Sequence, residues 1–187
     1  MKKLFLTAGL ALCLVGCQGT PKEQTPEPST PPISTTEKAA QAPTAFSFHG
    51  KNRKGEAVDS SILEASPVTF VNLWGTFCRP CLHEMPELER LAKEYEGRIQ
   101  VLGITTDVPA EEDPSHAEDL LQQMGITYPI VYPSMDSLYQ EPLASTTILP
   151  TSYFVNKEGK ILSEPILGMH SYEQWKVYFD DILAKQQ

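Results

Sequence analysis

Two cysteines separated by two residues carry the reactive chemistry of this sequence. They lie in the stretch Trp74-Gly-Thr-Phe-Cys78-Arg-Pro-Cys81, and a helical pattern follows them at once. Such a pair can be a redox couple, half of a metal site or a structural disulfide. A bridge over so short a loop gains little entropy, and a zinc site needs about four ligands, of which only His83 lies near in sequence. The redox interpretation is therefore favoured, and it requires neither a metal nor a cofactor.

The position of the pair predicts how its two thiols differ. Cys78 comes where a buried strand meets a helix, and the first N–H groups of a helix have no intrahelical partner. These N–H groups and the helix dipole place a partial positive charge at the helix start, which favours a thiolate over a thiol. Arg79 adds a full positive charge beside it. Pro80 fits the first turn, where its missing N–H costs nothing. Cys81 lies one turn further on and is expected to be more buried and less acidic.

This asymmetry indicates thiol–disulfide exchange. The Cys78 thiolate attacks a substrate disulfide and forms a mixed disulfide, and Cys81 then attacks Cys78 and releases the reduced substrate. The same steps in reverse would oxidise a dithiol. A reductive role needs an outside reductant to restore the pair.

Hydrophobic patterns predict the elements that position the cysteines. Residues 68–74 suit a strand buried on both faces, and apolar residues at helical spacing follow from Leu82 to Tyr95, with Gly97 ending that helix. The other expected elements are a hairpin over 46–59, a buried strand over 99–105, a helix within 109–124, a short strand within 126–132, one or two helical turns within 134–140, a hairpin of 151–155 with 160–166, and a helix over 172–183. Pro129 would place the short strand at an edge.

Strands that alternate with helices imply a central mixed sheet flanked by helices, with the first hairpin as an N-terminal extension. The stretch Asn72-Leu-Trp74-Gly-Thr-Phe-Cys78-Arg-Pro-Cys81-Leu-His-Glu84-Met-Pro86-Glu-Leu88 resembles the TlpA/ResA-like branch of the thioredoxin superfamily. Leu149-Pro150-Thr151 is similar to the place where that superfamily has a cis-proline against the cysteine pair. The resemblance covers residues 45–187 and implies one α/β domain with a thioredoxin-like fold.

The resemblance also implies roles for several residues. Trp74, Arg79, Pro80, Leu149 and Pro150 would shape the substrate site, and the backbone of Leu149 would pair with an extended substrate segment. Thioredoxins have a buried Asp where this chain has Asn72. The proton acceptor for Cys81 must then be another group, and Glu84 or water could serve; a solvated surface role for Glu84 stays open.

The resemblance implies a protein disulfide reductase rather than a general oxidant. Its substrates would be exported proteins with disulfides, such as apocytochrome c, and its electron donor a membrane thiol-transfer protein. One alternative is a peroxidase of the peroxiredoxin-like group, but Gly75 and Val71 stand where peroxiredoxins have Thr and Pro. A second alternative is a surface lipoprotein that binds a partner without catalysis.

The N-terminus predicts an extracytoplasmic protein held at a membrane. Residues 1–16 have two lysines followed by an apolar run, which is typical of a signal peptide. The run ends in Leu14-Val15-Gly16-Cys17, which resembles the lipobox of bacterial lipoproteins and implies lipidation of Cys17. Residues 17–44 are rich in Pro, Thr and Glu and are expected to form a disordered tether. The net charge of −9 excludes nucleic acid as a partner.

Overall fold

The structure is a computed structural model that describes residues 45–186. The predicted signal peptide (1–16), the lipidated Cys17 and the tether (17–44) lie outside these residues. The elements are β1 (His49–Asn52), β2 (Ala57–Asp59), a 3₁₀ helix η1 (Ser60–Ala65), β3 (Val68–Trp74), α1 (Arg79–Glu94), β4 (Ile99–Thr105), α2 (Ser115–Met124), β5 (Ile130–Pro133), α3 (Met135–Leu138), β6 (Thr151–Asn156), β7 (Ile166–Leu167) and α4 (Tyr172–Ala184). Within this range, no helix has both the length and the apolar composition needed to cross a bilayer.

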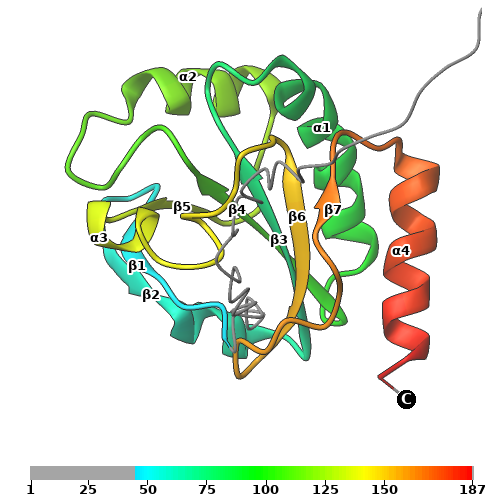
Figure 1. The fold of residues 1–187 in the computed structure, drawn as a ribbon. Helices are drawn as coiled ribbons and strands as arrows, with labels where there is room; N and C mark the ends of the chain where they lie inside the picture. The colour runs from blue at the N-terminus through cyan, green and yellow to red at the C-terminus, as the bar shows by residue number, and fades with distance from the viewer. Residues whose placement is uncertain (1–44, 187) are drawn as a thin grey trace, which may run out of the picture. The chain divides into compact units, whose positions relative to one another are not determined.

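One mixed sheet of seven strands organises the domain, in the order β2-β1-β5-β4-β3-β6-β7 (Figure 1). Strands β3, β4 and β5 run parallel, whereas β1 and β6 pair antiparallel with their neighbours. The predicted thioredoxin-like α/β fold, with a mixed sheet and an N-terminal hairpin, is confirmed. Strand β3 lies near the middle of the sheet, so the cysteines that follow it start from a rigid support.

The residues of β3 explain why both faces of the sheet are covered. Phe70 and Trp74 point into one apolar cluster, and Val71 and Leu73 point into another, as the two-residue period of a strand requires. The first cluster includes residues of the long helices α1, α2 and α4. The second is closed by η1, by α3 and by the segment before β1. Helices therefore flank both faces, with the long ones sharing a single face.

Strand β5 is not an edge strand, so that prediction is wrong. Its parallel partner is β4, and β1 pairs antiparallel with its other side through Gly50, opposite Pro133. Pro129 lies just before the strand and still contributes its carbonyl oxygen, which accepts a hydrogen bond from the Gly103 N–H at 2.9 Å. The N-terminal hairpin, β1 and β2, thus extends the sheet beyond β5, which Pro129 had indicated as the edge.

The predicted hairpin of β6 with the following segment forms at its two ends. Thr151 pairs with Leu167 near one end, and Val155 pairs with Ile161 near the other. Between them the ladder is interrupted, and the hydroxyl of Ser163 accepts the Phe154 N–H at 3.1 Å. Pro165, which has no N–H to donate, lies in the interrupted part.

The described chain begins beside the turn that follows β6. The Phe46 N–H donates a hydrogen bond of 2.6 Å to the carbonyl oxygen of Gly159. Gly159 has a positive φ of 78°, and a Cβ there would lie 2.8 Å from the carbonyl oxygen of Phe46. Glycine is therefore needed at this position, because another side chain would displace the start of the domain.

Candidate active site

Cys78 and Cys81 are joined by a disulfide at the start of α1. Cys78 is the N-cap residue, and its Sγ accepts a hydrogen bond from the Cys81 N–H at 3.2 Å. Pro80 lies in the first turn, as expected. Cys78 keeps 6% of its surface exposed, whereas Cys81 has none. A substrate sulfur can therefore reach Cys78 only, and the thiolate that forms there faces the free N–H groups of the helix.

An aspartate from the neighbouring strand holds the turn between β3 and α1. Asp107, which follows β4, accepts hydrogen bonds from the Thr76 N–H at 2.9 Å and from the Thr76 hydroxyl at 2.6 Å. The Cys78 N–H donates to the Gly75 carbonyl oxygen at 3.0 Å, which closes the turn. No motif in the sequence indicates this role of Asp107. A polar residue at the carboxyl end of the parallel neighbour of β3 was the signal that could have found it.

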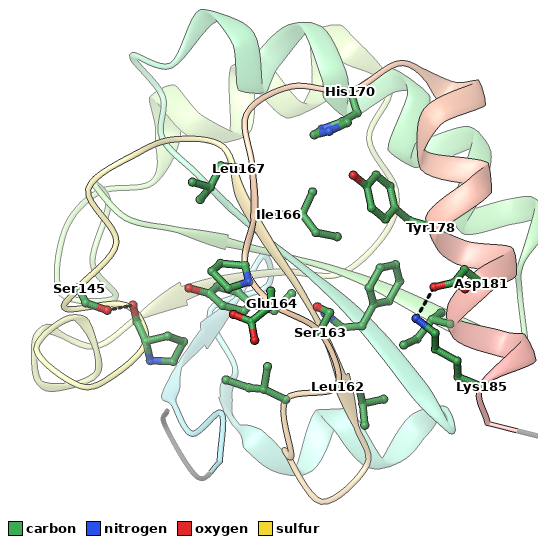
Figure 2. A pocket seen from close by; sticks show the side chains of 16 residues that line it. Ser145, Leu162, Ser163, Glu164, Ile166, Leu167, His170, Tyr178, Asp181 and Lys185 are labelled. Atoms are coloured by element: carbon green, nitrogen blue, oxygen red, sulfur yellow. Dashed lines mark hydrogen bonds and ion pairs between the residues drawn. The ribbon is translucent and has the colours of Figure 1, made fainter. Parts of the chain in front are cut away.

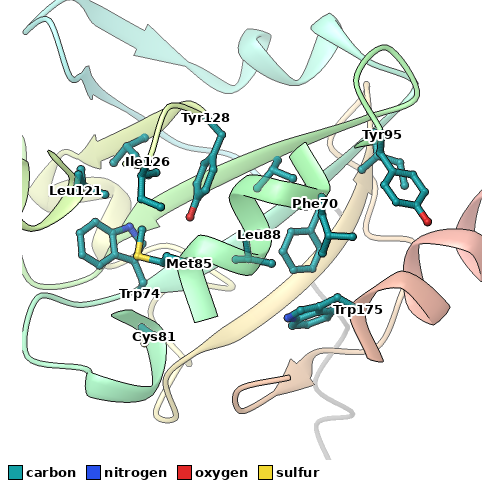
Figure 3. Close-up of a cluster of buried hydrophobic side chains, with 14 of the residues drawn as sticks. Phe70, Trp74, Cys81, Met85, Leu88, Tyr95, Leu121, Ile126, Tyr128 and Trp175 are labelled. Carbon is teal, nitrogen blue, oxygen red and sulfur yellow. The ribbon is translucent and has the colours of Figure 1, made fainter. Parts of the chain in front are cut away.

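Trp74 does not shape the surface of the site, so that prediction is wrong. Its side chain is fully buried. Figure 3 shows it in the apolar cluster beneath the cysteines, beside Met85 and on the same side as Cys81. The aromatic residue that reaches the surface next to the pair is Phe77, which is 72% exposed. Trp74 therefore supports the site from below.

The peptide bond between Leu149 and Pro150 is cis, as the resemblance implied. Leu149 is half-buried and lies beside Cys78 in an open groove of about 720 Å³. The same groove is lined by Phe77, Arg79 and Pro80 from the cysteine turn. Its other wall is the end of α3 and the loop before β6, with Leu138, Tyr139, Leu143, Ala144, Thr146 and Thr147. Three of the predicted site residues, Arg79, Pro80 and Leu149, thus line the groove beside Cys78, and Pro150 is buried next to Leu149.

Glu84 is a buried carboxyl group one helical turn after Cys81, not a solvated surface residue. Its Oε1 accepts a hydrogen bond from the Asn72 side-chain amide at 3.2 Å, and its Oε2 accepts one from the His170 N–H at 2.7 Å. Asn72 also donates to the Ser152 hydroxyl at 3.1 Å. Asn72 and Glu84 thus form a single polar network inside an apolar core, next to the cysteine pair.

Burial raises the pKa of Glu84 from its ordinary value of 4.5 to about 7, because the charged form loses its hydration. The hydrogen bonds from His170 and Asn72 oppose this shift, and the nearby Trp175 also favours the charged form. The Trp175 indole N–H makes no hydrogen bond of ordinary geometry. A carboxyl group with a pKa near neutrality can accept or donate a proton under physiological conditions.

A second and larger pocket, of about 960 Å³, lies between the β6–β7 segment and α4 (Figure 2). Neither cysteine lines it. The His170 side chain lies at its rim, whereas the His170 backbone N–H contacts Glu84. His170 is thus a loop residue, and His83 is exposed on α1. In residues 45–186, no three His, Cys, Asp or Glu side chains are grouped as metal ligands.

The chain is similar to proteins of one redox family. The model of the AhpC/TSA family matches residues 40–163. The thiol-disulfide oxidoreductase ResA of Halalkalibacterium halodurans is 30% identical over 130 residues, which are 67% of this chain and 68% of that protein. ResA of Bacillus anthracis is 27% identical over 130 residues, which are 69% of this chain and 70% of that protein.

Two solved structures show the same fold. The putative thiol:disulfide interchange protein DsbE from Chlorobium tepidum superposes with a TM-score of 0.60 at 23% identity, over 75% of this chain and 94% of that one. StoA from Bacillus subtilis superposes with a TM-score of 0.57 at 24% identity, over 73% of this chain and 98% of that one.

Proposed function

Because this chain belongs to the AhpC/TSA family and is a thiol-disulfide oxidoreductase with a thioredoxin-like fold, we propose that it exchanges disulfides through a mixed disulfide at Cys78, which Cys81 resolves. One observation carries this assignment of roles: Cys78 caps α1 and reaches the surface, whereas Cys81 is sealed beneath it. In the reductive direction, Cys78 displaces one substrate thiolate and Cys81 displaces the other. The substrate gains two electrons and two protons, and the protein is left with its own disulfide.

Glu84 is proposed as the proton acceptor for Cys81. It follows Cys81 by one helical turn and shares its buried environment, where bulk water is excluded. Its pKa of about 7 lets it take the Cys81 proton as that thiol attacks the mixed disulfide. We expect Glu84→Gln to slow the resolving step and to remove a kinetic pKa near 7. Single-turnover release of a fluorescent thiol from the mixed disulfide, measured against pH, checks this.

The cellular role is proposed to be reduction of disulfides in exported proteins such as apocytochrome c. The curated relatives named thiol-disulfide oxidoreductase ResA support disulfide exchange, and the resemblance to the TlpA/ResA-like branch favours the reductive direction. A membrane thiol-transfer protein would restore the Cys78–Cys81 dithiol. The chain would be held at the extracytoplasmic side of a membrane by lipidated Cys17. Cys17→Ser should release it from washed membranes into the soluble fraction, as tested by fractionation and immunoblotting.

Variants of the two cysteines test the exchange mechanism. Cys78→Ala should abolish reduction of insulin by the dithiol protein. Cys81→Ala should instead accumulate mixed disulfides with its partners, since Cys78 can still attack but nothing resolves the product. Trapped partners identified by mass spectrometry from the native cell would also name the substrates. Equal trapping by both single variants would contradict the assignment of roles, and an unreactive wild-type dithiol would favour a non-catalytic binding role.

A peroxidase is the second candidate, because the AhpC/TSA family model covers most of the domain. Gly75 and Val71 stand where the motif of peroxiredoxins has Thr and Pro, which counts against this candidate. Consumption of hydrogen peroxide with a thiol donor distinguishes the two activities. Rapid peroxide turnover together with slow insulin reduction would replace the reductase proposal.

A further inference from the structure

We propose that Phe77 and Tyr139 form a two-sided aromatic clamp, and that with Arg79 they select substrate peptides with an aromatic residue and a carboxylate beside the reactive cysteine. This inference rests on the proposed function and specifies the substrate class of the same site. The occupant is an extended peptide segment whose disulfide sulfur reaches Cys78. Its aromatic side chain would enter the groove between the two rings.

The exposure of two aromatic side chains carries the first step. Tyr139 is 76% exposed and Phe77 is 72% exposed, which makes them the most exposed large apolar side chains among residues 45–186. Both line the groove that contains Cys78. Exposed aromatic side chains that gather at one groove are typical of binding sites, since they bury much surface with few rotatable bonds.

The backbone that carries Tyr139 is anchored on both sides, so the wall of the groove is in place before a peptide binds. Ser137, just before it, is fully buried; its hydroxyl accepts the His49 N–H at 2.9 Å and donates to the His49 carbonyl oxygen at 3.0 Å. On the other side, Leu143 is buried, and the Thr146 hydroxyl donates to the Pro142 carbonyl oxygen at 2.9 Å. A preformed groove loses little conformational entropy when it binds a peptide.

Charge supplies the second element of selection. Of the described residues that line the groove, Arg79 alone carries a charge, and it stands next to Cys78. The whole chain has a net charge of −9, so the groove is a local cationic point on an acidic protein. A peptide carboxylate near the reactive cysteine is attracted to Arg79, whereas a basic peptide gains nothing there and is repelled at this point.

The reaction that reports the selection is a single turnover. Cys78 of the reduced protein attacks one sulfur of the peptide disulfide, that S–S bond breaks, and the displaced peptide thiolate takes a proton from water. Cys81 then attacks Cys78 and displaces the second peptide thiolate. The two protons of the protein dithiol pass through water to the two peptide thiolates, and the two electrons of the dithiol reduce the peptide disulfide, so no further reductant is required.

The experiment mixes full-length reduced protein with disulfide-bridged peptides that differ only beside one cysteine. Phe is compared with Ala at the adjacent position, and Glu with Lys at the next. Reaction is stopped by alkylation, and products are separated by chromatography. We expect the Phe peptide to react roughly tenfold faster than the Ala peptide, which corresponds to about 1.4 kcal/mol, and the Glu peptide to react faster than the Lys peptide in low salt.

Substitutions then assign the two preferences. Tyr139→Ala should bring the Phe/Ala rate ratio to within about twofold, and Tyr139→Phe should restore it, because the clamp uses the ring and not the hydroxyl. Arg79→Gln should abolish the Glu/Lys preference alone. Val177→Ala removes a similarly exposed apolar side chain from α4 and should change neither ratio.

Hydroxyethyl disulfide, a small neutral substrate, separates two kinds of failure. If wild-type protein reduces it but treats the Phe and Ala peptides alike, the clamp is wrong and the proposed function stands. A Phe preference that survives Tyr139→Ala would also overturn the clamp. If wild-type protein reduces neither hydroxyethyl disulfide nor any peptide, the proposed function fails and the clamp fails with it.

Discussion

The carboxyl group of Glu84 shows how one residue can serve chemistry at the expense of stability. Its pKa is raised in the folded protein, so folding holds a proton that the unfolded chain has already released above pH 4.5. The protein is therefore destabilised progressively as pH rises from 4.5 to about 7, and the full penalty remains above that range. From the size of the shift, the penalty is on the order of 3 kcal/mol.

We expect Glu84→Gln to remove this pH dependence. Its new amide can still accept the His170 N–H, and Asn72 can turn its own amide so that Oδ1, which lacks a partner, accepts a hydrogen bond. Urea unfolding of the disulfide form should show wild-type protein losing roughly 2–3 kcal/mol between pH 5 and pH 8 relative to the variant. Equal pH slopes for the two proteins would contradict a raised pKa at Glu84. Glu87→Gln, on the same helix but more exposed, is the matched control.

Individual residues differ in how well the sequence predicts them. Cys78, Cys81 and Pro150 belong to motifs with fixed spacing, and the structure places them as the motifs imply. Trp74 is buried and not at the surface as predicted, because closeness in sequence to a reactive residue does not determine where a side chain points. Asp107 was missed because its contact with Thr76 joins two different strands, and such a contact leaves no pattern in a single segment.

At the scale of the elements, Glu89 joins α1 to the loop that precedes β5. The carboxylate is nearly buried and accepts hydrogen bonds from the Thr127 N–H at 2.7 Å, the Thr127 hydroxyl at 2.5 Å and the Tyr128 N–H at 3.2 Å. Burial alone would raise the pKa of Glu89, but these hydrogen bonds and the one from Lys93 outweigh it and lower that pKa. The stabilising contribution is therefore present above the ordinary value of 4.5 and is lost as pH falls below it.

Glu89→Ala is expected to destabilise the protein by about 2–3 kcal/mol at pH 7, because it leaves two backbone N–H groups without a partner in a largely buried place. Glu87→Ala, two residues earlier on the same helix, breaks only an exposed ion pair with Arg90 and should cost less than about 0.5 kcal/mol. Chemical denaturation at pH 7 and pH 4 measures both. Similar losses for the two variants, or a Glu89 effect that persists unchanged in acid, would refute the role of this carboxylate.

Hydrophobic periodicity predicts whether a segment is a helix or a strand better than it predicts which elements lie next to each other. The helical spacing from Leu82 and the apolar run of β3 were sufficient to place α1 and the central strand. The prediction that β5 is an edge strand is wrong, because β1, from the start of the described domain, pairs with its second edge. Arg53, which follows β1, fixes that hairpin by pairing with Glu118 of α2 at 2.8 Å, a contact between segments that periodicity cannot relate.

At the scale of the whole molecule, both apolar clusters and every residue of the candidate site lie from Ala45 onward. We expect the chain beginning at Ala45 to fold cooperatively and to reduce insulin at the rate of the full-length protein, because the described residues supply the seven-stranded sheet, the elements that cover both its faces and the cysteine pair. Thermal unfolding and the insulin assay, made in parallel on both lengths, check this. A lower midpoint or a slower rate for the shorter chain would mean that the first 44 residues contribute to the domain.

The fold as a whole was predictable because one motif identified the superfamily and the alternation of strands and helices agreed with it. Local and global signals point to the same architecture, which is the property of sequences that fold to one structure. The groove beside Cys78 was not predictable. Its walls come from the cysteine turn and from the loop before β6, and the conformation of that loop is set by contacts with His49 and Pro142 rather than by a repeating pattern.

The start of the described domain and the reactive Cys78 lie at opposite ends of β3. The Phe46 N–H is hydrogen-bonded to Gly159, which lies near Asn156, the partner of Val68 at the first residue of β3. Cys78 instead follows the last residue of that strand. The seven residues of β3 separate these two ends of the strand by roughly 20 Å. If the predicted tether holds the domain at a membrane, as proposed, Cys78 lies at the opposite end of β3 from Phe46, where the domain starts. A donor embedded in the bilayer would then meet Cys78 when the domain rotates, which a disordered tether permits.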